Sequence, residues 1–153
     1  FGEKVIQAVK AVIPDDMPLI IRISAQEYGE NGYDSDYGVL MAQRFAKAGV
    51  DMIHVSGGGD GVLAKGHHPA FGAGYQVGLA NTIKQATGLP VIAVGMLDNP
   101  LVVDFVLEFG QADLVAVGRG LLRDPHWWLN AQRDLGQTAQ QMQDLPSSYT
   151  RGY

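Results

Sequence analysis

The stretch DLVAVGRGLLRDP, residues 113–125, decides the fold that this sequence predicts. After Asp113 its next four residues are apolar, which is typical of a strand buried in a parallel sheet. Gly118 ends that strand, and Leu121 and Leu122 then favour a short helix. A strand that runs into a helix through a glycine is the βα unit of α/β proteins. The stretch therefore predicts an α/β fold with parallel strands.

The same junction has the chemistry of an anion site. Glycine lets the backbone approach a ligand closely, and the first turn of a helix presents free N–H groups. Arg119 adds a fixed positive charge beside them. A phosphate group suits all three features. The alternative is that Gly118 only turns the chain and Arg119 lies in solvent, and a motif this short leaves both interpretations open.

Upstream of this stretch the same cycle of strand and helix occurs three more times. The expected strands are residues 19–24, 51–56, 90–95 and 113–117. Helices are expected at residues 1–12, from Asp34 or Ser35 to Gly49, at 77–86, from Asp98 or Asn99 to Gly110, and at 125–135. The apolar face of the helix before Gly110 comprises Leu101, Val102, Phe105, Val106 and Phe109.

Alternating strands and helices form either an open doubly wound sheet or part of a closed (β/α)8 barrel. Gly95 and Gly118 end the last two strands, where barrels commonly build a phosphate site from the loops after strands seven and eight. The G-x-G-x-x-G motif of a dinucleotide-binding sheet is absent after the first strand. A full barrel needs about 250 residues, and the chain has 153. The sequence therefore favours a (βα)4 half-barrel.

Composition narrows the classes of partner. The net charge of −5 gives no general attraction for nucleic acid or for an anionic membrane. The absence of cysteine excludes disulfides and thiolate metal sites, and the adjacent His67 and His68 make a poor metal site because their side chains diverge. No apolar run reaches about 18 residues, and no leader begins the chain. We expect a cytoplasmic protein with no metal.

Motifs along nearly the whole chain carry a resemblance. They are RIS at 22–24, VSGG at 55–58, GYQV at 74–77, AVGM at 93–96, ADL at 112–114, VGR at 117–119, LLRDP at 121–125 and YTRGY at 149–153. Together they resemble the old yellow enzyme family, in its branch of bacterial thermophilic-like, FMN-dependent ene-reductases. The resemblance implies that residues 1–153 are the C-terminal half of a TIM barrel, strands five to eight, and that an N-terminal half-barrel is missing.

The resemblance also implies contacts to FMN. Arg22 would lie beside the N1/O2 edge of the flavin ring, where hydride transfer to N5 leaves negative charge that a fixed arginine stabilises. The alternative is an arginine at the core edge that pairs with a carboxylate. The other residues that the resemblance assigns to FMN, through backbone contacts or a phosphate cradle, are Ser56, Gly57, Gly95, Met96, Gly118 and Arg119.

The implied reaction is reduction of FMN by NADPH or NADH, followed by hydride transfer from the flavin to an activated alkene. The residues that hold the substrate in this family lie in the N-terminal half, so no catalytic residue is assigned here. Arg151, in the tail 143–153, resembles an arginine that enters a neighbouring subunit's active site, which implies a homo-oligomer. We expect the chain without its other half to bind FMN weakly at best and not to reduce alkenes.

Two other functions stay open at this point. One is a phosphate-binding half-barrel of a different enzyme, such as a sugar-phosphate isomerase. The other is a non-catalytic half-barrel that associates with itself through unpaired strand edges. We expect the inner face of the sheet to contain residues such as Ile21, Ile53, Ile92 and Val115, or their alternates. His54 is expected to be a hydrogen-bonded structural histidine.

Overall fold

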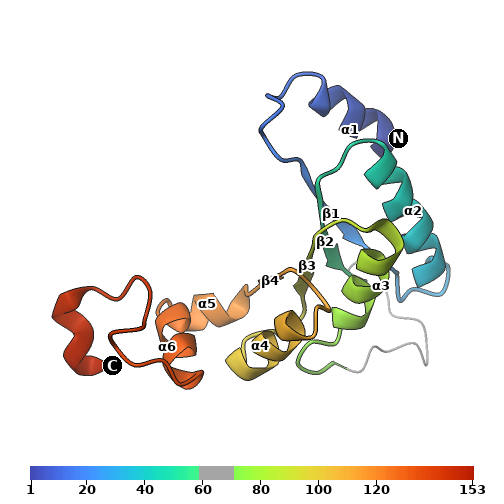
Figure 1. The fold of residues 1–153 in the computed structure, drawn as a ribbon. Coiled ribbons are helices and arrows are strands. Elements are labelled where there is room, and N and C mark those ends of the chain that lie inside the picture. Colours follow the sequence, from blue (N-terminus) through green and yellow to red (C-terminus); the bar gives the residue numbers. More distant parts are fainter. Residues whose placement is uncertain (59–70) are drawn as a thin grey trace.

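A computed structural model of the chain describes residues 1–58 and 71–153. Four strands alternate with helices, and the chain ends in a separate helical arm (Figure 1). No helix in the described part of the chain is long and apolar enough to cross a membrane. The elements are α1 (Gly2–Lys10), β1 (Ile20–Ser24), α2 (Ser35–Lys47), β2 (Met52–Ser56), α3 (Val77–Thr87), β3 (Val91–Val94), α4 (Pro100–Glu108), β4 (Leu114–Ala116), α5 (Arg119–Arg123), α6 (Trp127–Asp134) and the 3-10 helix η1 (Ser147–Gly152).

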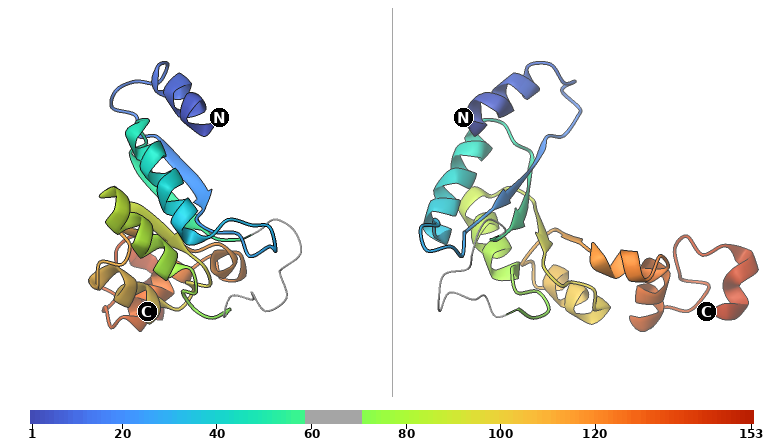
Figure 2. Two further views of the ribbon diagram at one scale, coloured as in Figure 1. Left: turned by 90° about the vertical axis from the view of Figure 1, so that its right-hand side faces the viewer. Right: turned by 180° about the vertical axis from the view of Figure 1, so that it is seen from behind.

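The order of the strands distinguishes between the two predicted folds. All pairings are parallel, and the order in the sheet is β1-β2-β3-β4, so each strand lies next to its neighbour in sequence. A doubly wound sheet reverses its strand order at a switch point and carries helices on both faces. Here α2, α3 and α4 lie on one face of the sheet (Figures 1 and 2). This is the geometry of a barrel segment, as the sequence predicted.

The two faces of the sheet have different chemistry because side chains alternate along a strand. On the helix-covered face Ile53, Val55, Val91 and Ala93 are completely buried. The open face has a row formed by Arg22, His54, Ile92 and Leu114, which are paired across the four strands.

The inner face that was predicted from the sequence is therefore only partly right. Ile53 is buried under the helices, and Ile21 and Val115 pack against the same core. Of the four residues named, Ile92 alone lies on the open face, and the other strands contribute the alternates. Where consecutive strand residues are all apolar, the sequence does not show which of them face the helices. The pattern by itself therefore did not decide which alternate residues form the inner face.

Helix ends agree closely with the sequence signals. Asp34 caps α2 by accepting a hydrogen bond from the Tyr37 N–H at 3.0 Å, and Asn99 caps α4 through the Leu101 N–H, also at 3.0 Å. Gly88 ends α3 with a φ of 69°, in the left-handed region that favours glycine. The caps predicted as Asp34 or Ser35 and as Asp98 or Asn99 are thus resolved to Asp34 and Asn99.

The apolar face predicted for α4 is wrong in part. Val103 and Val106 are its buried residues, whereas Leu101, Phe105 and Phe109 are more than half exposed. The helix is apolar around most of its circumference, so more than one stripe has helical spacing. The sheet selects the valine stripe, and the rings of Phe105 and Phe109 instead contact each other with centroids 4.3 Å apart.

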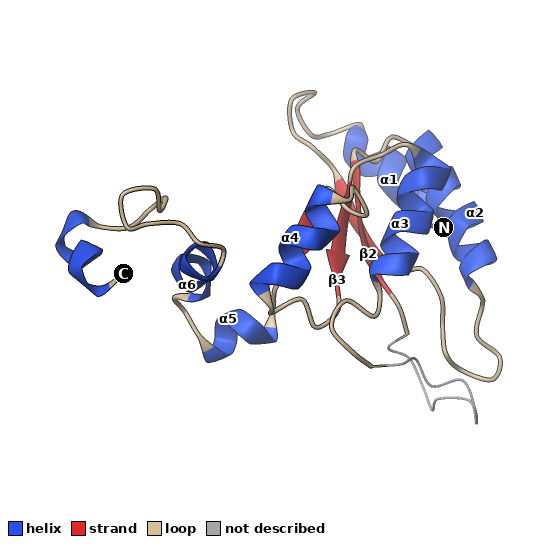
Figure 3. Cartoon of the chain, turned by 60° about the horizontal axis from the view of Figure 1, so that its bottom comes forward, coloured by secondary structure: helices blue, strands red, loops and turns tan. Residues whose placement is uncertain are grey.

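The segment after β4 forms an arm that extends away from α1 and the sheet (Figure 3). Trp127 attaches α6 to the body, because its indole N–H donates to the Asp98 carbonyl at 2.8 Å, while Trp128 is half exposed. The side chain of Gln132 is buried and bonds the backbone of Gln143 through both its oxygen and its nitrogen. Helix η1 has no buried residue, as expected for a tail without a core of its own.

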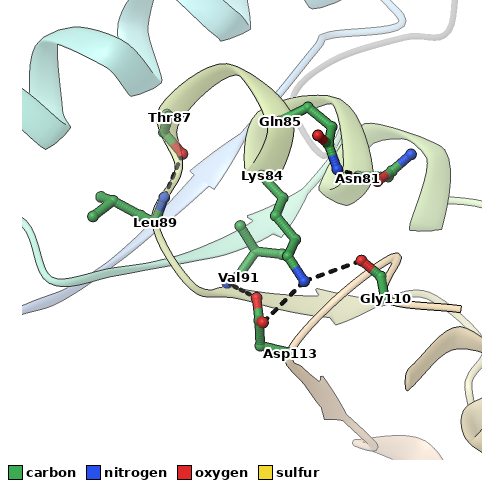
Figure 4. A network of polar contacts seen from close by, with 8 residues as sticks. All are labelled: Asn81, Lys84, Gln85, Thr87, Leu89, Val91, Gly110 and Asp113. Atoms are coloured by element: carbon green, nitrogen blue, oxygen red, sulfur yellow. Dashed lines mark hydrogen bonds and ion pairs between the residues drawn. The ribbon is translucent and has the colours of Figure 1, made fainter. Parts of the chain in front are cut away.

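Two matching networks join neighbouring strands at their amino ends. The Asp113 carboxylate accepts from the Val91 N–H at 2.9 Å and from Lys84 Nζ at 2.9 Å (Figure 4). Asp51 does the same with the Leu19 N–H at 2.7 Å and Lys10 Nζ at 3.0 Å. In each case the aspartate's own N–H returns a bond to the carbonyl of the same strand residue. The same pattern of hydrogen bonds therefore joins β1 to β2 and β3 to β4.

These networks lower the pKa of both aspartates. For Asp113 partial burial alone would raise the pKa, but the Lys84 and Val91 hydrogen bonds and the Lys84 charge together lower it below 3.8. For Asp51 the Leu19 N–H is the main cause, followed by Lys10. A carboxyl group whose folded pKa is depressed stabilises the fold above its unfolded pKa. That contribution is lost as the pH falls through the folded value.

We predict that Asp113→Asn lowers the free energy of unfolding near neutral pH by about 1 kcal/mol, at the low end because the pair is partly exposed. The difference from the wild type should shrink as the pH falls from 3.8 through the lower pKa of Asp113 in the folded protein, because the wild-type carboxyl group then becomes neutral as well. Urea midpoints measured near pH 7 and near pH 2.5 would check this. Asp16→Asn, at an exposed turn, is the control. An equal loss at both pH values would contradict the assignment.

Candidate functional site

A cleft of about 350 Å³ lies at the carboxyl ends of the strands. It brings together every residue that the sequence assigned to FMN, from all four strands or the loops that follow them. Those residues are Arg22, Ser56, Gly57, Gly95, Met96, Gly118 and Arg119. Parallel strands meet their loops at one edge, so residues as far apart in sequence as Arg22 and Arg123 share this cleft.

Arg22 reaches the cleft from the open face of β1. Its Nη1 lies 2.8 Å from His54 Nε2 and 3.3 Å from Nδ1, and its Nη2 donates to Ser56 Oγ at 3.2 Å. Within the described residues Arg22 forms no ion pair with a carboxylate. The interpretation of Arg22 as a carboxylate-paired arginine at the core edge therefore has no support in this part of the chain.

His54 contacts a residue of the cleft, which the sequence did not indicate. It is hydrogen-bonded, as expected, but its partner is Arg22. Burial lowers the pKa of His54 below its ordinary value of 6.5, and the charge of Arg22 lowers it further. The available signal was parity, because His54 shares the face of Ser56 on β2.

The backbone after β3 has an unusual conformation. Gly95 has a φ of 124° and Met96 a φ of 53°, so two consecutive residues have positive φ. The Gly95 carbonyl accepts from the Gly74 N–H at 2.9 Å, which links this turn to the segment before α3. A side chain at Gly95 would lie 3.1 Å from both Gln76 Oε1 and the Tyr75 ring. Gly95 is therefore required by the chain itself.

Gln76 is a residue of the cleft that the sequence did not identify. Its side chain is only 3% exposed, and its Nε2 donates to the Gly57 carbonyl at 2.9 Å. This hydrogen bond fixes the backbone just after β2, and the same side chain lies next to Gly95, just after β3. Gln76 lies within the GYQV motif, but a buried glutamine between an aromatic residue and a valine has no local pattern that distinguishes it.

Gly118 and Arg119 form the other side of the cleft at the start of α5. Gly118 has a φ of −93°, and a side chain there would meet none of the described residues within 4 Å. Neither backbone strain nor packing requires glycine at this position, whereas a ligand held close to the main chain would. Gly120 differs, because a Cβ there would approach Asp98 and Val117 to 2.8 Å.

Three arginines line the cleft, and their partners differ. Arg123 forms an ion pair with Asp98, and Arg22 is held by neutral groups. Arg119 is exposed and has no hydrogen bond or ion pair among the described residues. Two positive charges therefore remain uncompensated at opposite sides of the cleft, an arrangement suited to an elongated anion.

Some expected residues lie outside this site. Arg151 belongs to the exposed η1 and does not line the cleft. His67 and His68 lie outside the described residues, and so does most of the loop predicted at 57–74. Among the residues described, no group of three or more histidine, aspartate or glutamate side chains is placed to hold a metal ion.

Comparison with known proteins gives a consistent family. The sequence model of the NADH:flavin oxidoreductase / NADH oxidase family matches residues 1–138. An NADPH dehydrogenase of Geobacillus thermodenitrificans (strain NG80-2) is 37% identical over 153 residues, which cover 100% of this chain and 42% of the relative. An NADH oxidase of Thermoanaerobacter brockii is 37% identical over 128 residues, 83% of this chain and 20% of the relative.

Solved structures agree on the fold. A 2-naphthoyl-CoA reductase complex superposes with a TM-score of 0.72 at 18% identity, over 92% of this chain and 21% of that one. Histamine dehydrogenase from Rhizobium sp. 4-9 gives a TM-score of 0.68 at 21% identity, over 88% of this chain and 19% of that one. At such identities the likeness concerns the fold alone. The chain spans less than half the length of the curated relatives it matches.

We predict that Gly95→Ala destabilises the protein by about 1 to 3 kcal/mol, because alanine rarely adopts its φ and the added Cβ is crowded. Gly78→Ala is the matched control. Gly78 is within α3, and a Cβ there meets nothing within 4 Å, so the change should stabilise the helix by up to about 1 kcal/mol. Urea denaturation of both variants measures this. Equal effects of the two substitutions would refute the role assigned to the Gly95 turn.

Proposed function

The chain belongs to the NADH:flavin oxidoreductase / NADH oxidase family, and we propose that it supplies the phosphate and ring contacts for FMN in an NAD(P)H-dependent oxidoreductase. The observation that carries the proposal is the convergence of Arg22, Ser56, Gly57, Gly95, Met96, Gly118 and Arg119 on one cleft.

The residues divide into two groups by chemistry. Arg119, with the backbone at Gly95 and Gly118, would hold the phosphate, because open amides and a free guanidinium favour a dianion. Arg22 would lie at the ring, where a fixed positive charge stabilises negative charge at its electron-rich edge. Bound FMN would supply the hydride chemistry, and the chain's own residues would bind and orient it and bias its charge.

The finer proposal is an ene-reductase, in which hydride passes from the flavin to an activated alkene. It rests on the resemblance to thermophilic-like ene-reductases. Among the described residues, the lining of the cleft comprises mainly arginines, glycines and a buried glutamine, with Tyr75 and Asp98 as its other titratable side chains. The resemblance implies that the proton donor to the substrate belongs to an N-terminal half-barrel.

An absorption spectrum after incubation with FMN tests the proposal most directly. A flavin spectrum that remains with the protein after gel filtration, or is perturbed by it at higher concentration, supports FMN binding. A chain that neither retains nor perturbs FMN but binds a sugar phosphate would instead favour the isomerase-like half-barrel. Self-association without either ligand would favour the non-catalytic half-barrel.

We predict that Arg119→Ala weakens FMN binding about 10- to 100-fold, the equivalent of losing a charge-assisted contact of about 1.5 to 3 kcal/mol. Quenching of flavin fluorescence measures the affinity. Arg44→Ala is the control, because Arg44 is exposed on α2 and pairs only loosely with Glu3 at 3.7 Å. An unchanged affinity in Arg119→Ala would remove Arg119 from the phosphate site.

We further predict that Arg151 acts across a subunit interface in a homo-oligomer. Deleting residues 147–153 should shift the oligomeric state or weaken substrate binding in the longer enzyme. It should leave the unfolding midpoint nearly unchanged, because η1 has no buried residue and touches α6 mainly through Arg133 over the Tyr153 ring at 6.0 Å. Arg151→Ala alone separates the charge from the segment. If the truncation changes neither the mass measured on a sizing column nor the substrate affinity, Arg151 has no such role.

A further inference from the structure

The contact between Arg22 and His54 determines the protonation state of the histidine. Arg22 Nη1 lies 2.8 Å from Nε2 and 3.3 Å from Nδ1, and an atom this close to both ring nitrogens lies over the face of the imidazole and not on the in-plane lone pair of either nitrogen. An imidazolium in this contact would place a second positive charge against the first. His54 is therefore neutral whenever it holds Arg22.

Neutral partners hold an arginine differently from a carboxylate. Asp98 both orients Arg123 and cancels its charge. His54 and Ser56 orient Arg22 through Nη1 and Nη2 and cancel nothing. The positive charge of Arg22 thus stays available to an anion in the cleft, while its side chain loses the freedom to turn away. A preoriented charge costs less to use than one that must first be ordered.

We propose that His54 is a positioning residue for Arg22: together with Ser56, its neutral imidazole aims the guanidinium into the cleft and leaves its charge uncompensated for an anionic ligand. The positioning itself rests on the geometry of β1 and β2. Its consequence for a flavin rests on the proposed function.

The surroundings of His54 favour the neutral form. Across β3 its register partner is Ile92, which has no ionisable group. On β1 its register partner is Arg22, whose charge lowers the pKa of His54 in addition to the lowering by burial. On its own strand Met52 and Ser56 share its face, and neither carries a charge. These groups keep His54 neutral at physiological pH.

Nitrogen-15 NMR of the histidine rings in the 153-residue chain tests the positioning without any ligand. In the wild type we expect His54 to be neutral near pH 7, because a charged ring would face the Arg22 guanidinium. In Arg22→Gln its pKa should rise toward 6.5 because the neighbouring charge is gone. Arg44→Gln should leave the His54 titration where it is. The proposal would be overturned if His54 were protonated near pH 7, or if Arg22→Gln left the pKa of His54 unchanged.

Binding of FMN, followed by flavin fluorescence, tests the consequence. His54→Leu removes the polar ring that contacts the guanidinium and should weaken binding about tenfold, whereas His54→Gln keeps a neutral polar group there and should bind within a few-fold of the wild type. His126→Gln is the control for a histidine on the exposed arm. Circular dichroism would confirm that each variant folds.

The pH profile separates positioning from mere packing. Wild-type affinity should fall as His54 becomes protonated, and His54→Gln should lack that loss while still reporting the titration of the FMN phosphate itself. Identical affinity and pH profile in wild type and His54→Leu would refute the role. If the wild type shows no FMN binding at all, the proposed function of the chain fails, and the NMR titration still decides whether His54 positions Arg22.

Discussion

The alternation of side chains along four parallel strands is the constraint on which the rest of the structure depends. Ile53, Val55, Val91 and Ala93 are buried completely under the helices, and this burial fixes the rotation of β2 and β3. Every residue of opposite parity must then face away from the helices. Arg22 and Ser56 reach the cleft for that reason, and His54 lies beside Arg22 on the same face. Burial of the apolar core thus decides where the polar residues of the site lie.

The charged residues at the two ends of the strands are paired differently. At the amino ends the Asp51 and Asp113 networks close the sheet with paired, largely compensated charges. At the carboxyl ends Arg22 and Arg119 remain uncompensated, and the backbone adopts the positive φ of Gly95 and Met96. The paired charges thus lie at the end of the sheet that is far from the cleft. The unusual backbone conformation and the unpaired charges, which cost free energy, lie in the cleft, where a bound ligand would offset that cost.

Much of the fold could be predicted from the sequence because its signals are local. Asp34, Asn99 and Gly88 are capping residues whose effect depends only on the next turn. The seven residues proposed to contact FMN came from motifs, and they converge because parallel strands share one edge. What the sequence did not decide required a choice between similar faces. Two stripes of α4 have helical spacing, and β3 and β4 are apolar on both faces.

The partners of the three cleft arginines are the clearest case of information that sequence lacks. Arg22, Arg119 and Arg123 carry the same charge, and the residues next to each of them in the sequence do not reveal its partner. Only the fold shows that Arg123 is paired with Asp98, that Arg22 is held by His54 and Ser56, and that Arg119 has no partner in the described chain. Those differences decide which charges can act on a ligand. The charge of an arginine that is paired with a carboxylate is largely cancelled. The charge of an arginine that is oriented by a neutral imidazole still acts on a ligand in the cleft. The functional difference between these arginines therefore depends on the partner of each.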